Sequence, residues 1–107
     1  MITNSPYQSH LFMNNIQVAI IEDEKPAARL LEGMIKKLRP QWDIIKIPGS
    51  IESSVAWFAS HPHPDIVFLD IQLSDGNSFL FIEQVCPTSL IILSLIHISE
   101  PTRHLRI

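Results

Sequence analysis

The sequence has 107 residues, a formal net charge of −3 and a hydrophobic fraction of 46%. These values are typical of one small globular domain, and they argue against a basic face for direct nucleic-acid binding. Cys86 is the single cysteine, which excludes a disulfide framework and a cysteine-rich metal site. Because its neighbours are apolar, we expect Cys86 to be a small core residue.

The two ends of the chain carry no membrane or export signal. No apolar run reaches the roughly 18–20 residues that a membrane span requires. Residues 1–15 are polar and lack the basic and apolar regions of a signal peptide. We therefore expect a cytoplasmic protein without membrane contact, in which residues 1–15 are an unstructured or spurious extension and Met13 is an alternative start.

The first organised segment is an apolar run from Ile16 to Ile21, which predicts a strand buried on both faces. Pro26 suits the first turn of a following helix, and Pro40 ends that helix. Its apolar residues recur every three or four positions and predict one apolar stripe. They are Ala27, Leu30, Leu31, Met34, Ile35 and Leu38.

The same alternation continues along the chain. The pattern predicts a strand over 44–47, a helix over 51–59, a strand over 66–70, a turn at 75–77, a helix over 79–85 and a strand from 90. Phe79, Ile82 and Val85 outline the last of these helices. Apolar strands that alternate with helices predict an α/β fold, with a parallel sheet and helices on both faces.

Carboxylates follow two of the predicted strands. Glu22 and Asp23 come after the first strand, and Asp70 comes after the third. Functional sites of parallel sheets lie beyond the carboxyl ends of the strands, so these acids converge if the two strands are neighbours. Converging carboxylates need a proton or a cation, and their oxygens suit Mg²⁺. The pattern predicts phosphoryl transfer to an aspartate.

Two segments carry a family resemblance: VAIIEDEKPAARLL at 18–31 and PDIVFLDIQLSDGNSF at 64–79. Together they resemble the receiver domain of two-component response regulators, in particular the LytTR-type regulators. The resemblance covers residues 16–92. It implies a flavodoxin-like (CheY-like) parallel sheet, here truncated after about the fourth strand.

The resemblance also implies a role for each acidic residue. Asp70 would be the phosphoacceptor and a ligand of Mg²⁺. Asp23 would bind the metal directly, and Glu22 would act mainly through water. The backbone carbonyl of Gln72 would complete the protein's share of the metal ligands.

The pattern departs from the family after the fourth predicted strand. Receivers carry a Thr or Ser at the end of that strand. In this sequence the alignment places Leu95 at that position, with Ser94 next to it. They also carry a lysine after a fifth strand, but every lysine in this sequence precedes Asp70. Residues 93–103, LSLIHISEPTR, resemble the translation of a transposase-derived sequencing adapter. We therefore expect a partial receiver domain over 16–92 and a non-native tail over 93–107.

The resemblance implies a signalling module rather than an enzyme. A histidine kinase would phosphorylate Asp70, and the receiver would control a LytTR-type DNA-binding domain that this sequence lacks. DNA would be a partner only through that domain, and homodimerisation of the intact regulator stays open. One alternative is a phosphorylation-independent pseudo-receiver that serves as an interaction module. Another is a haloacid-dehalogenase-type phosphatase, which requires an acid where Gln72 stands.

The truncation also predicts low stability. Because a missing strand and helix would shrink a small core, we expect the isolated 107-residue chain to be unstable or to aggregate.

Overall fold

The central strand of the sheet is β1 (Gln17–Glu22), whose residues from Val18 to Ile21 are apolar and fully buried. The computed structural model describes residues 15–94. In this part of the chain β1 lies between β2 (Asp43–Pro48) and β3 (Ile66–Asp70), and β6 (Leu90–Ser94) pairs with the far side of β3. All three pairings are parallel. The strand order β2-β1-β3-β6 confirms the predicted CheY-like α/β fold.

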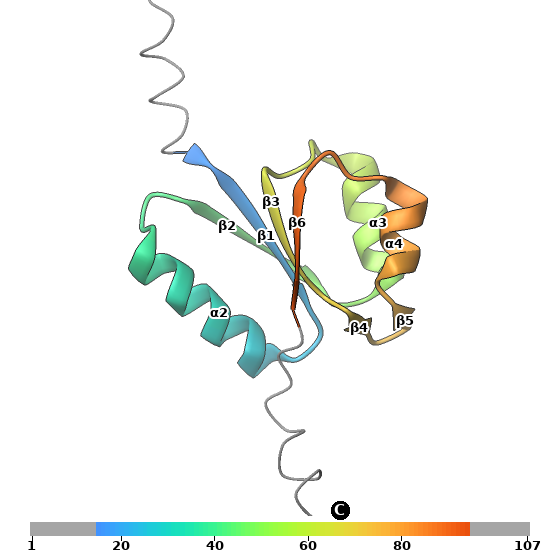
Figure 1. Cartoon of the computed structure of the whole chain (residues 1–107), viewed down its shortest axis with the longest axis horizontal. Coiled ribbons are helices and arrows are strands. Elements are labelled where there is room, and N and C mark those ends of the chain that lie inside the picture. Colours follow the sequence, from blue (N-terminus) through green and yellow to red (C-terminus); the bar gives the residue numbers. More distant parts are fainter. Residues whose placement is uncertain (1–14, 95–107) are drawn as a thin grey trace, which may run out of the picture.

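Helices cover both faces of this sheet (Figure 1). Helix α2 (Lys25–Leu38) lies on one face, and helices α3 (Ile51–Ser60) and α4 (Phe79–Val85) lie together on the other. The core under α3 and α4 consists of Ala19, Ile21, Ile47, Ile51, Phe58, Val67, Leu69, Leu73 and Phe81. The core under α2 is smaller and consists of Val18, Ile20, Ala28 and Ile35.

The apolar stripe of α2 is wider than the surface that it buries. Ala27 and Ile35 are buried, but Leu30, Met34 and Leu38 are 52%, 50% and 67% exposed. The apolar stripe predicted from the sequence is therefore only partly buried. The physical reason is that α2 is the only described helix on this face, so nothing described packs against the flank that carries these three residues.

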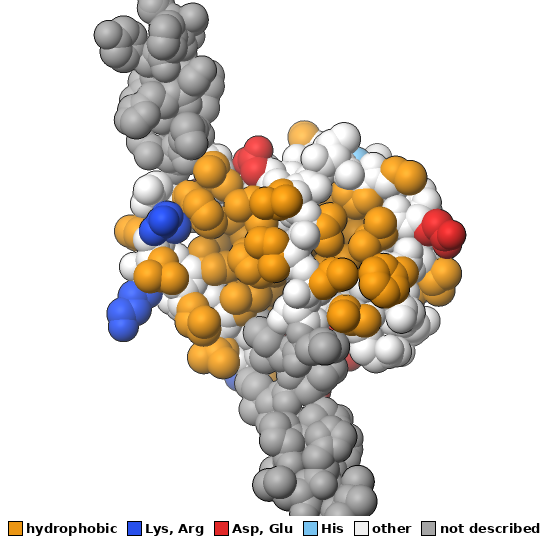
Figure 2. Space-filling model, viewed as in Figure 1, with side chains coloured by type: hydrophobic (Ala, Val, Ile, Leu, Met, Phe, Trp, Pro, Cys, Tyr) orange, Lys and Arg blue, Asp and Glu red, His pale blue; other side chains and the backbone are white. Residues whose placement is uncertain are grey.

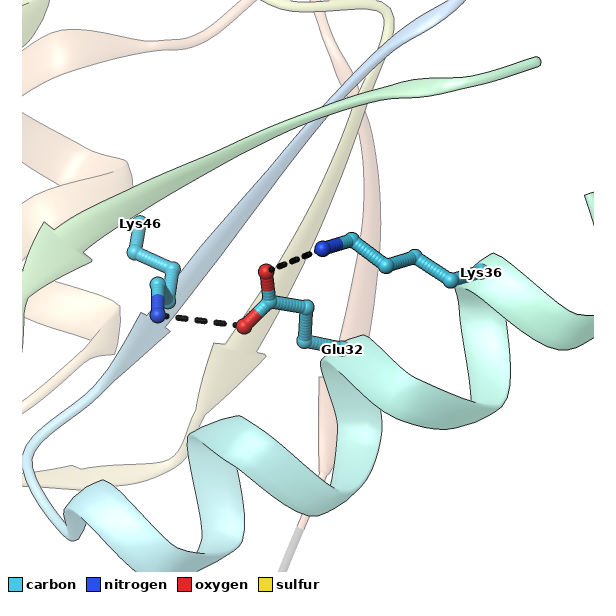
Figure 3. A network of polar contacts seen from close by, with 3 residues as sticks. All are labelled: Glu32, Lys36 and Lys46. Carbon is cyan, nitrogen blue, oxygen red and sulfur yellow. Dashed lines mark ion pairs between the residues drawn. The ribbon is translucent and has the colours of Figure 1, made fainter. Parts of the chain in front are cut away.

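On its opposite flank, α2 forms an ion pair with the sheet through Glu32. Glu32 accepts contacts from Lys36 of the same helix at 3.2 Å and from Lys46 of β2 at 3.0 Å (Figure 3). The Glu32 side chain is only 19% exposed, and the two lysines hold its pKa below the usual range. The pairing places α2 over β2 and β1 and leaves the β3–β6 half of this face without a described helix.

The helix predicted over 79–85 is confirmed as α4. Its buried anchor is Phe81, which packs edge-on against Phe58 with ring centroids 5.0 Å apart, whereas Phe79 is 52% exposed. The expectation for Cys86 was wrong. Cys86 is exposed rather than part of the core. It follows the last turn of α4 in the left-handed conformation, at a φ of 49°, and this helix-ending position points away from the core.

A short hairpin between β3 and α4 was not predicted. Strands β4 (Gln72–Leu73) and β5 (Gly76–Asn77) pair antiparallel around Ser74 and Asp75. The predicted turn at 75–77 is therefore shifted by about one residue towards the amino end. Leu73 is buried and joins the core under α3 and α4, which fixes the hairpin against the domain.

Other predictions concern the two ends of the described region. Strand β6 runs two residues past Ile92, so that Leu93 and Ser94 belong to the sheet. The extension expected over 1–15 and the rest of the tail expected over 93–107 lie outside the described residues, apart from Asn15 and these two residues. Among residues 15–94, no helix is both long and apolar enough to cross a membrane.

Candidate functional site

Three acidic side chains meet at the carboxyl end of the sheet. Strands β1 and β3 are neighbours, with Ile21 opposite Leu69, so the acids that follow these residues emerge side by side. Glu22, Asp23 and Asp70 each offer a carboxylate oxygen within 4.8 Å of the others. Asp70 is 2% exposed, whereas Glu22 is partly buried and Asp23 is exposed. The structure thus brings together the three side chains predicted from the sequence.

Among the three acids, Glu22 has a strongly raised pKa. Burial, followed by the hydrogen bond and charge of Asp70 and the nearby Asp23, raises the pKa of Glu22 from 4.5 to about 8. A hydrogen bond at 3.2 Å from the Glu24 amide to Glu22 Oε2 opposes that rise. At neutral pH the cluster therefore holds a proton or needs a cation close to its oxygens.

The donor set fits Mg²⁺. All three groups are carboxylates, which are hard oxygen ligands, and one of them is exposed and accessible to water. Mg²⁺ is usually bound by one or two carboxylates together with waters and phosphate oxygens. A bound ion would replace the proton that the raised pKa of Glu22 otherwise retains.

Gln72 lies beside the cluster, at the start of the hairpin. Its backbone N–H donates a hydrogen bond to Asp70 Oδ1 at 3.3 Å. This contact orients the buried carboxylate from the carboxyl side of β3. The role of the Gln72 carbonyl as a metal ligand stays a prediction.

The loop after β2 approaches the cluster through Gly49. A Cβ atom at position 49 would collide with the backbone of Glu22 and Asp23, so only glycine permits this approach. The Gly49 carbonyl accepts hydrogen bonds from the Ser74 amide at 3.0 Å and from Ser74 Oγ at 3.1 Å. Gly49 therefore contacts the turn that carries Asp23 and is hydrogen-bonded to the hairpin after Asp70.

Asp75 caps α3 and lies outside the acidic cluster. Its two carboxylate oxygens accept hydrogen bonds from the Ile51 amide at 2.6 Å and the Glu52 amide at 3.1 Å. These bonds, chiefly the one from Ile51, lower the pKa of Asp75. The sequence marked Asp75 as a turn residue but gave no sign of this cap, because the contact joins residues more than twenty positions apart.

Strand β6 places a hydroxyl residue opposite the buried aspartate. Ser94 is the register partner of Asp70, and the Ser94 carbonyl accepts a hydrogen bond from the Ile71 amide at 3.2 Å. The alignment assigned the hydroxyl position to Leu95, which lies outside the described residues. In the sheet itself, Ser94 is the β6 residue level with Asp70.

A cavity of about 550 Å³ opens beside Glu22 and Asp23, between the β1–α2 and β2–α3 loops. Its wall combines the two acids with basic side chains. The lining residues are Glu22, Asp23, Lys25, Ala28, Arg29, Lys46, Ile47, Pro48, Gly49, Ser50 and Ser74. One of the basic residues, Lys46, already pairs with Glu32.

Comparison with known proteins shows the fold but no family. No family model matches the sequence, and no curated protein matches it. Among solved structures, the response regulator PhyR from Brucella abortus is similar, with a TM-score of 0.63 and 24% identity over 79% of this chain. A fusion protein with a trimeric coiled-coil segment of yeast Spc42 has a TM-score of 0.63 and 20% identity over 86% of this chain. The chain spans only 37% and 61% of those two proteins, respectively.

Proposed function

We propose that this chain is the phosphoacceptor part of a response-regulator receiver, which takes a phosphoryl group on Asp70 with Mg²⁺. The observation that carries the proposal is the convergence of Glu22, Asp23 and Asp70 within 4.8 Å at the carboxyl end of a sheet with CheY-like strand order. The similarity in fold to PhyR supports the same function.

In this proposal each residue has a distinct task. A carboxylate oxygen of Asp70 attacks the phosphorus of the donor, and the bond between phosphorus and the leaving group breaks as the aspartyl phosphate forms. Asp23 and Asp70 would hold Mg²⁺, with Glu22 acting mainly through water, and the ion would neutralise charge on the transferred group. The Gln72 amide donates a hydrogen bond that orients the Asp70 carboxylate at the carboxyl end of the sheet.

The wider biological assignment belongs to the same proposal. The donor would be a histidine kinase, the setting would be cytoplasmic, and the output would be a LytTR-type DNA-binding domain outside this sequence. Support for that output comes from the sequence resemblance over 16–92. A lysine after Asp70 is missing from the sequence, so the proposal assigns binding of the phosphoryl group here and not its readout.

The test is to incubate the 107-residue chain with acetyl phosphate and Mg²⁺ and to measure its intact mass. We expect one phosphoryl increment, its loss when Mg²⁺ is chelated, and its loss in Asp70→Asn. The matched control is Asp43→Asn, which changes an exposed aspartate at the start of β2 and should leave the increment unchanged.

Three outcomes would overturn the proposal. The first is no increment in a folded sample, which would favour the pseudo-receiver alternative. The second is an increment that survives Asp70→Asn. The third is continuous release of inorganic phosphate from small phosphate esters, which would favour a phosphatase.

A further inference from the structure

The hairpin that follows Asp70 is held mainly by hydrogen bonds. Leu73 is its one buried side chain, since the other residues of β4, β5 and the turn between them are exposed or partly exposed. In Figure 1 the hairpin projects from the carboxyl end of the sheet below α4, and Figure 2 shows mainly white atoms, which are backbone and uncharged polar groups, in the same place. Apolar packing therefore fixes the hairpin chiefly at Leu73, and its other anchors are polar.

Ser74 joins the hairpin to the loop after β2. The Ser74 amide and the Ser74 hydroxyl both donate to the Gly49 carbonyl, at 3.0 Å and 3.1 Å. A carbonyl oxygen has two lone pairs and can accept both bonds at once, so the pair of donors restricts the direction in which Ser74 can move. Gly49 itself lies against the backbone of Glu22 and Asp23. The hairpin is therefore anchored to a residue that touches the turn carrying two of the acids.

The start of the hairpin reaches the third acid. The Gln72 amide donates to Asp70 Oδ1 at 3.3 Å. This distance exceeds the usual range of about 2.7–3.2 Å for an N–H···O bond, so a small outward movement of the hairpin would break the contact. Gln72 lies just before Leu73 and Ser74, and Asn77 pairs with it across the hairpin. A displacement at Ser74 therefore reaches the Gln72 amide through a short, paired segment.

Asp75 holds the tip of the hairpin to a different element. Its carboxylate accepts hydrogen bonds from the first two amides of α3, at 2.6 Å and 3.1 Å. If the Ser74 hydroxyl is removed, this carboxylate and the buried Leu73 still attach the hairpin to the domain. Loss of the hydroxyl should therefore shift the hairpin without releasing it.

We propose that Ser74 is a positioning residue for the acidic cluster. Its hydroxyl keeps the hairpin on Gly49, so that the Gln72 amide stays bonded to the Asp70 carboxylate and holds it beside the other two acids. Ser74 also lines the cavity that opens beside those two acids, which places it next to the cluster. The relevance of this role to phosphoryl transfer rests on the proposed function, whereas the positioning itself is a property of the chain without Mg²⁺.

The test compares variants of the 107-residue chain by NMR without Mg²⁺. Ser74→Ala should move the Gln72 amide proton upfield, as expected for a weakened hydrogen bond, and Ser74→Thr, which keeps a hydroxyl, should restore the wild-type shift. The matched control is Ser60→Ala, which removes a hydroxyl that donates to the Ala56 and Trp57 carbonyls at the other end of α3. This control should leave the Gln72 amide unchanged.

Titration with Mg²⁺ adds a second readout. Removing a partner that orients a metal ligand typically weakens binding about 10–100-fold, and Ser74 acts one contact further away, so Ser74→Ala should raise the Mg²⁺ Kd by about three- to tenfold. With acetyl phosphate at saturating Mg²⁺, phosphorylation of Asp70 should also slow in Ser74→Ala and recover in Ser74→Thr. A wild-type chain that binds Mg²⁺ but gains no phosphoryl group would reject the proposed function alone, because the amide shift and the Kd do not depend on it.

The Gln72 amide decides whether Ser74 has this role. An amide proton that does not move in folded Ser74→Ala, or that moves as far in Ser60→Ala, would overturn the proposal. A folded Ser74→Thr that keeps the shift of Ser74→Ala would also overturn it. Far-ultraviolet circular dichroism identifies a variant that fails to fold. If Ser74→Ala does so, Ser74→Cys, which keeps the size of the side chain but is a weak donor, should give a smaller shift of the same sign.

Discussion

Under α3 and α4 the sheet closes over a continuous core, whereas the opposite face carries only α2 among the described residues and leaves Leu30, Met34 and Leu38 half or more exposed. Both faces are built from the same strands, since alternate residues of β1 and β3 contribute to each. The difference therefore lies in what covers the sheet. Because the core under α3 and α4 contains more buried residues, we expect it to contribute more to the free energy of folding than the core under α2.

The largest loss of stability is expected for Phe81→Ala on the α3–α4 face. Phe81 is fully buried and packs against Phe58, so truncation should cost about 3–5 kcal/mol of the free energy of unfolding. Urea denaturation followed by circular dichroism measures the change. Phe79→Ala, at a 52% exposed neighbour, is the matched control and should stay within about 0.5 kcal/mol. Equal losses in the two variants would contradict the assignment of the core.

A smaller loss is expected for Ile35→Ala on the α2 face. Ile35 is 7% exposed, but the adjoining surface is open, so neighbouring side chains can move into the space that it leaves. We expect a cost of about 2 kcal/mol, at the lower end of the range for such truncations. A loss as large as that of Phe81→Ala, measured in the same urea series, would mean that the two faces contribute equally.

The carboxyl end of the sheet makes the stability of the fold depend on pH between about 4.5 and about 8. The pKa of Glu22 is about 8 in the fold and 4.5 ordinarily, so the folded state binds the extra proton between these values. Without Mg²⁺, the Tm should therefore fall as pH rises from about 4.5 to about 8, and Glu22→Gln should flatten this decline. Added Mg²⁺ should raise the Tm more at pH 8 than at pH 5.

Thermal melts across this pH range check the prediction for Glu22. The matched control is Glu83→Gln, which neutralises an exposed acid on α4 and should keep the wild-type slope. A Tm that rises with pH in the absence of Mg²⁺ would contradict the role given to Glu22.

The smallest effect is expected for Asp75→Ala, which removes one of the side-chain caps of α3. Helix α3 has side-chain caps from Ser50 and Asp75, whereas α2 has no side-chain cap at Glu24. Because the pKa of Asp75 is lowered, its stabilising contribution is present above its ordinary value of 3.8 and is lost as pH falls through the lower folded value. The Tm should drop slightly at pH 7, and the difference from wild type should vanish in acid. A difference that persists in acid would contradict the cap.

Much of this fold was predictable because its signals are local. Apolar runs gave the strands, Pro26 gave the start of α2, and acids after β1 and β3 gave the candidate site. Once the sheet is parallel, the carboxyl ends of adjacent strands lie at the same edge, so the convergence of Glu22 and Asp70 follows from topology.

The features that were missed depend on contacts between distant segments. Periodicity identified the apolar residues of α2 but not the absence of a described neighbour beside Leu30, Met34 and Leu38. Asp75 reads as a turn residue because its partners in α3 are far away in the sequence. Cys86 looked like a core residue because hydrophobicity alone does not reveal a left-handed end of a helix.

Gly49 has a consequence for how this protein can vary. Because any side chain at position 49 would collide with the backbone of Glu22 and Asp23, the spacing of the acidic cluster depends on a residue that carries no charge. A mutational library selected for Mg²⁺ binding should therefore retain glycine at position 49 as strictly as it retains the acids. Neighbouring loop positions that lack such a contact should tolerate many residues. Even alanine at position 49 should weaken the proposed Mg²⁺ binding, although it leaves every acidic residue of the cluster in the sequence.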